Sequence, residues 1–194
     1  VMQKKRDTSI ASATFLTTLL DFSDPGDLGV FLDEEEVDMR AAQVSKDGVM
    51  SGKSLALGFN MLRSNDLIWH FVVQHYLLGK QPFPFDLLYW NTDVTRLPAK
   101  MQQFYLRNMY QRNKLAEAGG IRLKDTPIDL SAISCPIYML STREDHIAPW
   151  QSTYKLTQRV KGPIRFVLAA SGHVAGVINP PERKKYAHWV SDHC

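Results

Sequence analysis

The chain has 194 residues, of which 44% are hydrophobic and 22% charged, and its formal net charge is +3. This composition is typical of a globular chain long enough to bury a core, which excludes intrinsic disorder. The weak positive charge predicts no nucleic-acid partner, and the lack of any run of about 18 apolar residues predicts no membrane span.

The first two thirds of the chain predict one strand followed by helices. Residues 13–20 are apolar and rich in strand formers, which predicts a buried strand, and turn residues over 21–26 end it. Residues 33–48 predict a helix that Asp33 caps and Gly48 ends. Further helices are expected over 51–79, split near 63–66 with Asn65 capping the second part, and over 98–118.

The last third has a different pattern. Residues 135–140 and 164–169 predict short apolar strands, and residues 149–160 between them predict a helix. A strand, a helix and a second strand at this spacing form a βαβ unit, so the two strands are expected to be parallel. The chain therefore predicts an α/β fold with a core over 1–32 and 128–194 and a mostly helical cap inserted over 33–127.

Chemically useful side chains follow both predicted strands of the βαβ unit. Asp145 comes shortly after the first strand, and His173 comes shortly after the second. Because the carboxyl ends of parallel strands meet at one edge of a sheet, both side chains are expected there. An acid followed by a histidine is the order of the last two triad members of an α/β-hydrolase. The carboxylate would orient the imidazole, which would act as the base, and Gly172 and Gly176 would let the histidine loop turn tightly.

Each of the two residues also has a plainer interpretation. Asp145 lies four residues before Pro149 and could be a helix cap, and His173 could be an ordinary surface histidine. Their order and their matched positions after neighbouring strands favour the catalytic interpretation.

Other motifs are weaker. Residues 48–54 imitate a phosphate-binding loop but have three residues between the glycines instead of four, so no nucleotide site is expected. His70 and His75 are five residues apart, which predicts no shared helix face and no metal site. The aromatic residues Phe83, Phe85, Tyr89 and Trp90 could belong to a core or to an exposed patch.

Several strings resemble the polyhydroxyalkanoate synthases, the bacterial polyester polymerases, and look closest to their class I enzymes. The strings are Thr-Arg-Glu-Asp-His-Ile over 142–147, Ser-Gly-His-Val-Ala-Gly-Val-Ile-Asn-Pro-Pro over 171–181, Leu-Thr-Thr-Leu-Leu-Asp-Phe over 16–22, Asn-Asp-Leu-Ile-Trp over 65–69 and Pro-Phe-Asp-Leu-Leu-Tyr-Trp-Asn over 84–91. The resemblance runs from about residue 13 to 189 and implies an α/β-hydrolase core with a helical cap.

The resemblance implies a specific activity. The family joins (R)-3-hydroxyacyl-CoA units, typically 3-hydroxybutyryl-CoA, into polyester and releases CoA, which is part of the substrate, so no separate cofactor is expected. Its acid matches Asp145, which would orient the histidine or help to activate the incoming hydroxyl. Its histidine matches His173, which would deprotonate a cysteine nucleophile or the incoming hydroxyl. His146, beside the acid, also matches the family and is expected to be a supporting residue. The resemblance further implies a cytoplasmic, granule-associated enzyme that dimerises through its cap. In such an enzyme Arg183, Lys184 and Lys185 could contact the CoA phosphates, but a solvated helix start is the favoured interpretation.

The chain differs from the family in lacking the motif that carries the nucleophile. Neither Gly-x-Cys-x-Gly nor Gly-x-Ser-x-Gly occurs, Cys135 is expected to be a buried packing residue, and Cys194 a frayed end. Because the nucleophile motif is missing, the isolated chain is expected to be inactive. The chain begins with Val1 rather than Met, so we expect part of a longer protein. Two cysteines make no disulfide framework, which favours a reducing compartment. Two alternatives remain: a lipase or esterase with the same acid and histidine, and a non-catalytic granule-binding or assembly module.

Overall fold

The chain divides into two units, each described by itself below. In the computed structural model, residues 7–82, 87–178, 182 and 184–191 are described. The first unit combines Val1–Asp33 with Tyr105–Cys194, and the second is Glu34–Phe104. The predicted cap began at residue 33, one residue before the second unit, but it extended to 127, whereas the segment from Tyr105 onward groups with the first unit. The second unit is mostly helical, and the first contains the main sheet.

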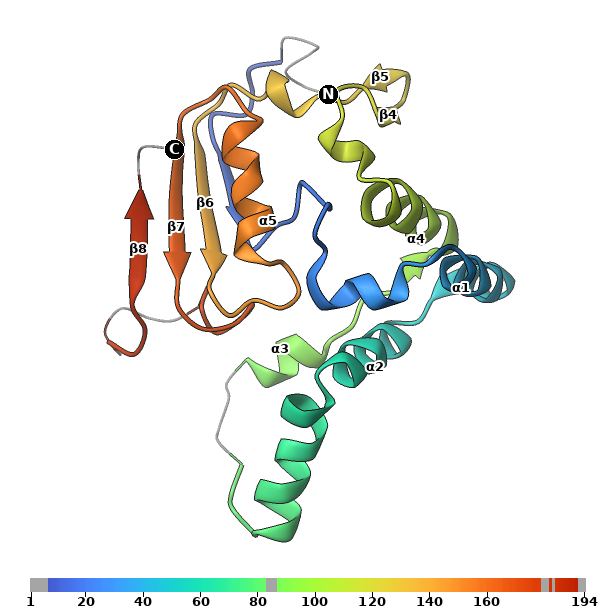
Figure 1. The fold of residues 1–194 in the computed structure, drawn as a ribbon, viewed down its shortest axis with the longest axis vertical. Helices are drawn as coiled ribbons and strands as arrows, with labels where there is room; N and C mark the ends of the chain where they lie inside the picture. The colour runs from blue at the N-terminus through green and yellow to red at the C-terminus, as the bar shows by residue number, and fades with distance from the viewer. Residues whose placement is uncertain (1–6, 83–86, 179–181, 183, 192–194) are drawn as a thin grey trace. The chain divides into compact units, whose positions relative to one another are not determined.

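The main sheet has the strand order β1-β6-β7-β8. Its strands are β1 (Ala13–Leu16), β6 (Ile137–Thr142), β7 (Ile164–Ala169) and β8 (His188–Ser191). β6 pairs in parallel with β1 and with β7, as the βαβ pattern predicted, and β8 is antiparallel to β7. In Figure 1 the arrowheads of β6 and β7 reach the same edge of the sheet, and that of β8 points the other way. No strand was predicted over β8, whose residues lack a long apolar run.

The first strand is shorter and more exposed than predicted. It ends at Leu16 because Thr17 has φ of 45°, in the left-handed region that a strand cannot include. Its side chains alternate between half-buried and exposed, and Leu16 is 46% exposed. The prediction of a buried strand over 13–20 was therefore wrong in both length and burial.

The core of the first unit lies between the sheet and α5 (Trp150–Tyr154), which continues as a 3-10 turn, Lys155–Gln158. Figure 1 shows α5 against one face of the sheet. Alternate residues of β6 point toward this layer, because side chains alternate across a strand. The Ser141 hydroxyl is hydrogen-bonded to that of Thr153 at 2.6 Å, which fixes α5 on β6. The buried core cluster is Leu130, Ile137, Met139, Leu156 and Phe166.

The second unit contains the predicted helices with altered ends. Gly48 has φ of 72° and follows α1, which confirms it as the stop. Asn65 was predicted to cap the second part of 51–79 but lies inside the helical segment that begins at Ser64, so that prediction was wrong. The elements are α1 (Glu34–Asp47), β2 (Val49–Met50), α2 (Gly52–Leu62), π-helical turns Asn65–Trp69 and Val72–Leu77, α3 (Leu88–Thr92), β3 (Leu97–Pro98) and α4 (Ala99–Tyr105).

The helix predicted over 98–118 ends early. After α4 it continues as a π-helical turn, Leu106–Gln111, and it stops before Asn113, which has φ of 46°. The left-handed conformation cannot continue a right-handed helix, and asparagine tolerates it better than most residues. The rest of the first unit contains 3-10 turns at Gly26–Phe31, Lys114–Ala116 and Leu130–Ala132 and the strand pair β4 (Arg122–Leu123) and β5 (Thr126–Pro127). Among the described residues, no helix is long and apolar enough to cross a membrane.

The Gln111 side chain links the segment where the chain leaves the first unit to the segment that follows its return. The Gln111 side-chain amide donates to the backbone carbonyl of Leu32 at 3.0 Å and to that of Asp33 at 3.4 Å. Residues 34–104 therefore begin and end at neighbouring points of the first unit.

Candidate active site

Asp145 and His173 lie together, as the sequence predicted. β6 and β7 end in register, with Thr142 opposite Ala169, so both following loops leave the same edge of the sheet. The His173 Nδ1 atom lies 2.8 Å from the Asp145 Oδ2 atom. The predicted hydrogen-bonded pair is thus present, formed by residues 28 positions apart.

The Asp145 carboxylate is buried and held on both oxygens. Its Oδ1 atom accepts hydrogen bonds from the backbone N–H groups of Ile147 and Ala148 at 2.9 and 2.8 Å. Its Oδ2 atom faces His173, and the Thr142 hydroxyl donates to it at 3.4 Å. Asp145 does not cap the following helix, because α5 has no side-chain cap at its N-cap residue, Pro149. The plainer interpretation of Asp145 as a helix cap is therefore wrong.

The acid loop, which follows β6 and contains Asp145, and the histidine loop, which follows β7 and contains His173, are hydrogen-bonded to each other beyond the strand ends. The Arg143 N–H donates to the Ala169 carbonyl at 2.8 Å, and the Glu144 N–H donates to the Ser171 carbonyl at 3.0 Å. Ser171 has φ of 79°, so the turn into the histidine loop is made by a non-glycine residue in the left-handed region. These bonds extend the parallel pairing and fix the two loops relative to each other.

The two glycines of the histidine loop differ in their surroundings. A Cβ atom at Gly176 would lie 2.5 Å from Thr142 Cγ2 and 2.7 Å from the Ala170 carbonyl oxygen, so this position requires glycine. A Cβ atom at Gly172 would approach nothing closer than 3.9 Å, and Gly172 has no positive φ. The prediction that both glycines are needed for a tight turn holds for Gly176 and is wrong for Gly172.

The pair has the arrangement of a general base with its orienting acid. A carboxylate only accepts hydrogen bonds, so Nδ1 of His173 is the donor, and the lone pair of the neutral ring is on Nε2. The side chain of His173 is 31% exposed, whereas that of Asp145 is fully buried. An imidazole held in one tautomer and open on one side can take a proton from a nucleophile and return it.

Other expected residues fall in different places. His146 is half-buried next to Asp145, and its supporting role stays a prediction. Cys135 is free and only half-buried, two residues before the start of β6 at Ile137, so its expected burial was wrong. Tyr89 and Trp90 are 88% and 65% exposed, which excludes a core position in this structure. Phe83, Phe85, Arg183 and Cys194 lie outside the described residues, and Lys184 and Lys185 are exposed.

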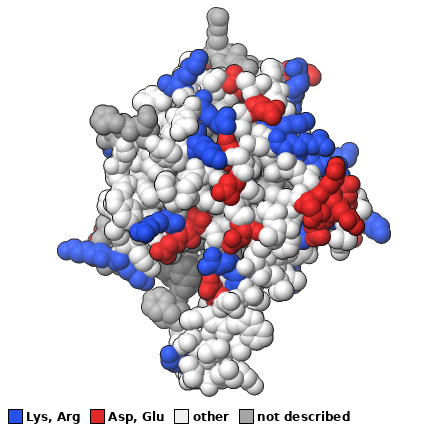
Figure 2. All heavy atoms as spheres, viewed as in Figure 1, with Lys and Arg blue, Asp and Glu red and all other residues white. Residues whose placement is uncertain are grey.

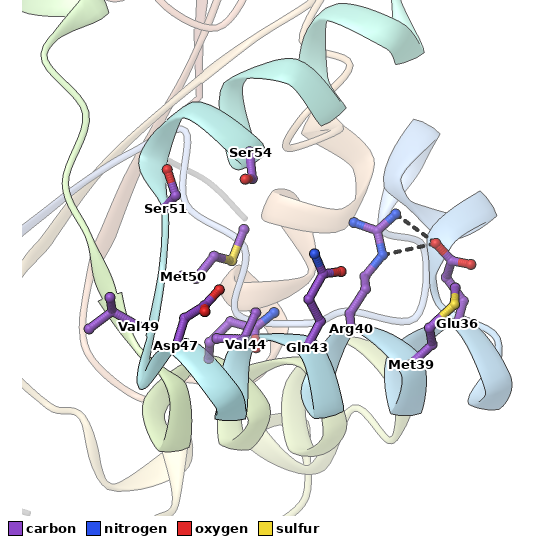
Figure 3. A pocket seen from close by; sticks show the side chains of 11 residues that line it. Glu36, Met39, Arg40, Gln43, Val44, Asp47, Val49, Met50, Ser51 and Ser54 are labelled. Atoms are coloured by element: carbon purple, nitrogen blue, oxygen red, sulfur yellow. Dashed lines mark hydrogen bonds and ion pairs between the residues drawn. The ribbon is translucent and has the colours of Figure 1, made fainter.

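The segment that imitates a phosphate loop is a junction between two helices. After Gly48 the chain forms the short strand β2, and the Ser51 hydroxyl accepts from the Lys53 N–H at 3.3 Å, capping α2. The segment borders a cavity of about 310 Å³ within the second unit. Figure 3 shows Arg40 and Gln43 on the α1 side of this cavity and Ser54 on the α2 side. Arg40 is paired with Glu36 at 2.7 Å, so its charge is already compensated by a carboxylate.

The sequence did not reveal the groups that hold the acid. Thr142 and the N–H groups of Ile147 and Ala148 act through positions that only the folded turn defines. In the described part of the chain, no group of three or more His, Cys, Asp or Glu side chains is placed to hold a metal ion.

Comparisons with known proteins agree with the α/β fold. The alpha/beta hydrolase fold family matches residues 2–180. The chain is 45% identical over 99% of its length to the poly(3-hydroxyalkanoate) polymerase subunit PhaC of Cupriavidus necator, and 47% identical over 95% to that of Rhizobium meliloti. It is 49% identical over 90% of its length to the poly(3-hydroxyalkanoate) polymerase of Methylorubrum extorquens.

The chain spans about a third of the length of these relatives, 33%, 30% and 29% respectively. The resemblance to polyhydroxyalkanoate synthases is confirmed by this similarity, and the α/β class is confirmed by the mostly parallel sheet. Since the matching region covers nearly all of the 194 residues, the chain belongs to the α/β-hydrolase fold family.

Proposed function

We propose that the full-length protein is a polyhydroxyalkanoate synthase. It joins (R)-3-hydroxyacyl units, typically 3-hydroxybutyryl units, from their CoA thioesters into a polyester and releases CoA. The observation that carries the proposal is the 2.8 Å hydrogen bond between Asp145 and His173 in a chain 45–49% identical to poly(3-hydroxyalkanoate) polymerases. No cofactor is needed beyond the CoA that the substrate itself brings.

In the proposed reaction, Nε2 of His173 takes the proton of a cysteine thiol from outside these 194 residues. The thiolate attacks the carbonyl carbon of the acyl-CoA, a thioester to the enzyme forms, and the bond to the CoA sulfur breaks. The departing CoA thiolate takes the proton from His173. The hydroxyl of an acyl unit then attacks the enzyme thioester, with His173 again accepting the proton, and an ester bond forms as the cysteine thiolate leaves.

In this scheme Asp145 orients His173 and stabilises the imidazolium that forms in each proton transfer. The burial of the carboxylate and its two backbone hydrogen bonds support this role, because they fix the oxygen that faces Nδ1. His146, next to Asp145 in the same loop, is proposed as a supporting residue. Because this chain supplies two of the three triad groups, the 194 residues alone are expected to release no CoA.

We further propose that the protein associates with itself through the helical unit and acts in the cytoplasm at the surface of polyester granules. From Ser64 to Leu78 the sequence contains one charged residue, Asp66. Figure 2 shows few charged atoms over this segment, in the lower part of the view. Exposed apolar surface of this extent supports a contact with another apolar surface. The exposed large apolar side chains of the segment are Leu67, Trp69, Phe71, Val73, Tyr76, Leu77 and Leu78.

The activity is tested in the full-length parent by following CoA release from 3-hydroxybutyryl-CoA. His173→Ala and Asp145→Ala are expected to abolish turnover, and His188→Ala, an exposed histidine of the same unit, is expected to retain it. Full turnover in either site variant would refute the catalytic assignment and favour a binding or assembly module. Release of acid from simple esters by a serine nucleophile, without polymer, would favour the esterase.

Self-association is tested by sedimentation of the full-length protein. Tyr76→Glu and Leu77→Glu place charges on side chains that are 84% and 65% exposed, and both are expected to shift the protein toward the monomer. Val30→Glu, at a side chain 69% exposed in the first unit, is the matched control and is expected to leave the distribution unchanged. An unchanged distribution for the two segment variants would contradict the proposed contact.

A further inference from the structure

A short segment after β1 follows α5 from its far end back to the acid loop. We call residues 21–26 the brace. Asp21 is paired with Arg159, the Lys155 ammonium donates to the Ser23 hydroxyl at 2.5 Å, and the Ser152 hydroxyl donates to the Asp24 carbonyl at 2.8 Å. Successive residues of the brace bond to successively earlier residues of α5 and its 3-10 turn, so the brace runs antiparallel to them.

The start of the brace is fixed by a buried charge. Asp21 is 2% exposed, and it accepts hydrogen bonds from the Ser23 N–H and hydroxyl, from the Asn113 amide and from the Arg159 guanidinium. Burial alone would raise the pKa of Asp21, but these donors outweigh burial and hold it well below its usual range. The carboxylate is therefore ionised and saturated with donors, which makes it a firm anchor.

Asn113 binds the anchor from a second chain segment. Its Nδ2 atom donates to Asp21 Oδ1 at 3.0 Å, and its Oδ1 atom accepts from the Phe22 N–H at 2.8 Å. Arg159 also donates to the Ala116 carbonyl at 2.9 Å. Three segments distant in sequence therefore meet at Asp21, and the start of the brace cannot shift without breaking several of these bonds.

The other end of the brace lies directly against the acid loop. Gly26 has φ of 64°, and a Cβ atom there would lie 2.9 Å from the His146 carbonyl oxygen and 2.9 Å from Pro149 Cγ. Those two contacts flank Ile147 and Ala148, whose N–H groups hold Asp145 Oδ1. The peptide units that fix the carboxylate are thus in contact with the end of an anchored segment.

We propose that the brace sets the orientation of Asp145 toward His173, with Gly26 and Asp21 as positioning residues. The inference rests on the proposed function for its kinetic consequence, but the geometry it concerns can be measured without turnover. A displaced acid loop misaligns the carboxylate and the imidazole, which lowers the rate of proton transfer and leaves substrate binding unchanged.

The main test compares Gly26→Ala with Gly119→Ala in the full-length protein. Both glycines have positive φ, 64° and 77°, but a Cβ atom at Gly119 meets only Pro127 Cβ at an ordinary 3.7 Å. Both variants carry the backbone strain, and only the first pushes on the acid loop. We expect Gly26→Ala to lower kcat about ten- to a hundredfold with KM unchanged, and Gly119→Ala to leave kcat near its native value.

A second measurement does not depend on activity. The proton that His173 Nδ1 shares with Asp145 is expected to give a downfield proton NMR resonance, identified by its loss in His173→Ala. Gly26→Ala is expected to shift or broaden this resonance, and Gly119→Ala to preserve it. An unchanged resonance and unchanged kcat in folded Gly26→Ala would overturn the proposal.

Two milder variants cover the case in which Gly26→Ala does not fold. Asp21→Asn removes the charge from the anchor, and Ser152→Ala removes the bond to the Asp24 carbonyl without adding atoms. Both are expected to lower kcat with unchanged KM, and native kcat in both would refute the brace. If Asp145→Ala abolishes turnover while all brace variants retain it, the brace fails and the proposed function stands. If Asp145→Ala retains turnover, the proposed function fails, and the resonance alone decides on the brace.

Discussion

Replacing Asp145 by asparagine tests the site with a change of very few atoms. The two backbone N–H groups at Oδ1, 2.9 and 2.8 Å away, require an acceptor, so the amide oxygen of Asp145→Asn must take that position. The amide nitrogen then occupies the position of Oδ2, 2.8 Å from His173 Nδ1, and presents a donor to it. Nδ1 becomes the acceptor, the ring proton moves to Nε2, and the base loses the lone pair it needs.

The size of the effect follows from the tautomer. The same exchange in a serine-protease triad lowers kcat about 10⁴-fold, which corresponds to about 5.5 kcal/mol in the activation free energy. We expect a loss of about 10³- to 10⁴-fold in CoA release for Asp145→Asn in the full-length protein, with little loss of stability. Asp145→Ala is expected to lose about 1–3 kcal/mol of unfolding free energy as well, because two buried N–H groups lose their acceptor.

The control is Asp129→Asn, at a carboxylate that likewise accepts from a backbone N–H two residues on, that of Ser131 at 3.0 Å. It is expected to retain native turnover. An Asp145→Asn variant that keeps more than about a tenth of native turnover would refute the tautomer argument, because a tenfold loss requires only about 1.4 kcal/mol.

Three further predictions concern the same unit and its core. Met139→Ala is expected to lower the unfolding free energy by about 2–5 kcal/mol in urea titrations, because Met139 is 0% exposed. The control Met39→Ala, at a side chain that is 59% exposed, is expected to change it by less than about 0.5 kcal/mol. Gly176→Ala is expected to lower both thermal stability and turnover, and Gly172→Ala neither, because only the first Cβ atom would clash; equal effects would contradict the contacts. The lowered pKa of Asp21 means that its ionised form favours folding, so its contribution is complete above about pH 4 and lost as the pH falls further. The difference in unfolding free energy between the native protein and Asp21→Asn is therefore expected to narrow on acidification, and a constant difference would refute the linkage.

The sequence predicted the proximity of Asp145 and His173 better than it predicted the elements around them. β7 was expected over 164–169 and lies at Ile164–Ala169, because a short apolar run between turn residues is a local signal. The proximity of Asp145 and His173 followed from the parallel pairing of two such strands. Both expectations depended on local pattern and on one general rule of sheet topology.

The failures have different physical causes. The strand at residue 13 and the helix from residue 98 were both predicted too long, because Thr17 and Asn113 adopt left-handed conformations that apolar periodicity does not reveal. The cluster at Asp21 joins residues up to 138 positions apart, so no local window contains it. Asp21 was expected only to be part of a turn, and tertiary contacts give it a second role.

The two hydrogen bonds from Gln111 to the carbonyls of Leu32 and Asp33 form a clip, which has a consequence for how the length of residues 34–104 can change. Since one amide joins the carbonyls of Leu32 and Asp33 to the returning chain, the loop that residues 34–104 form is closed at its base by the sheet-containing unit itself. The entropic cost of closing such a loop grows only slowly with its length, by about 0.6 kcal/mol per doubling, so moderate insertions or deletions within it are expected to leave its base intact. Chimaeras that exchange the whole stretch with that of a relative, cut on either side of the clip, are therefore expected to keep the 2.8 Å contact between Asp145 and His173.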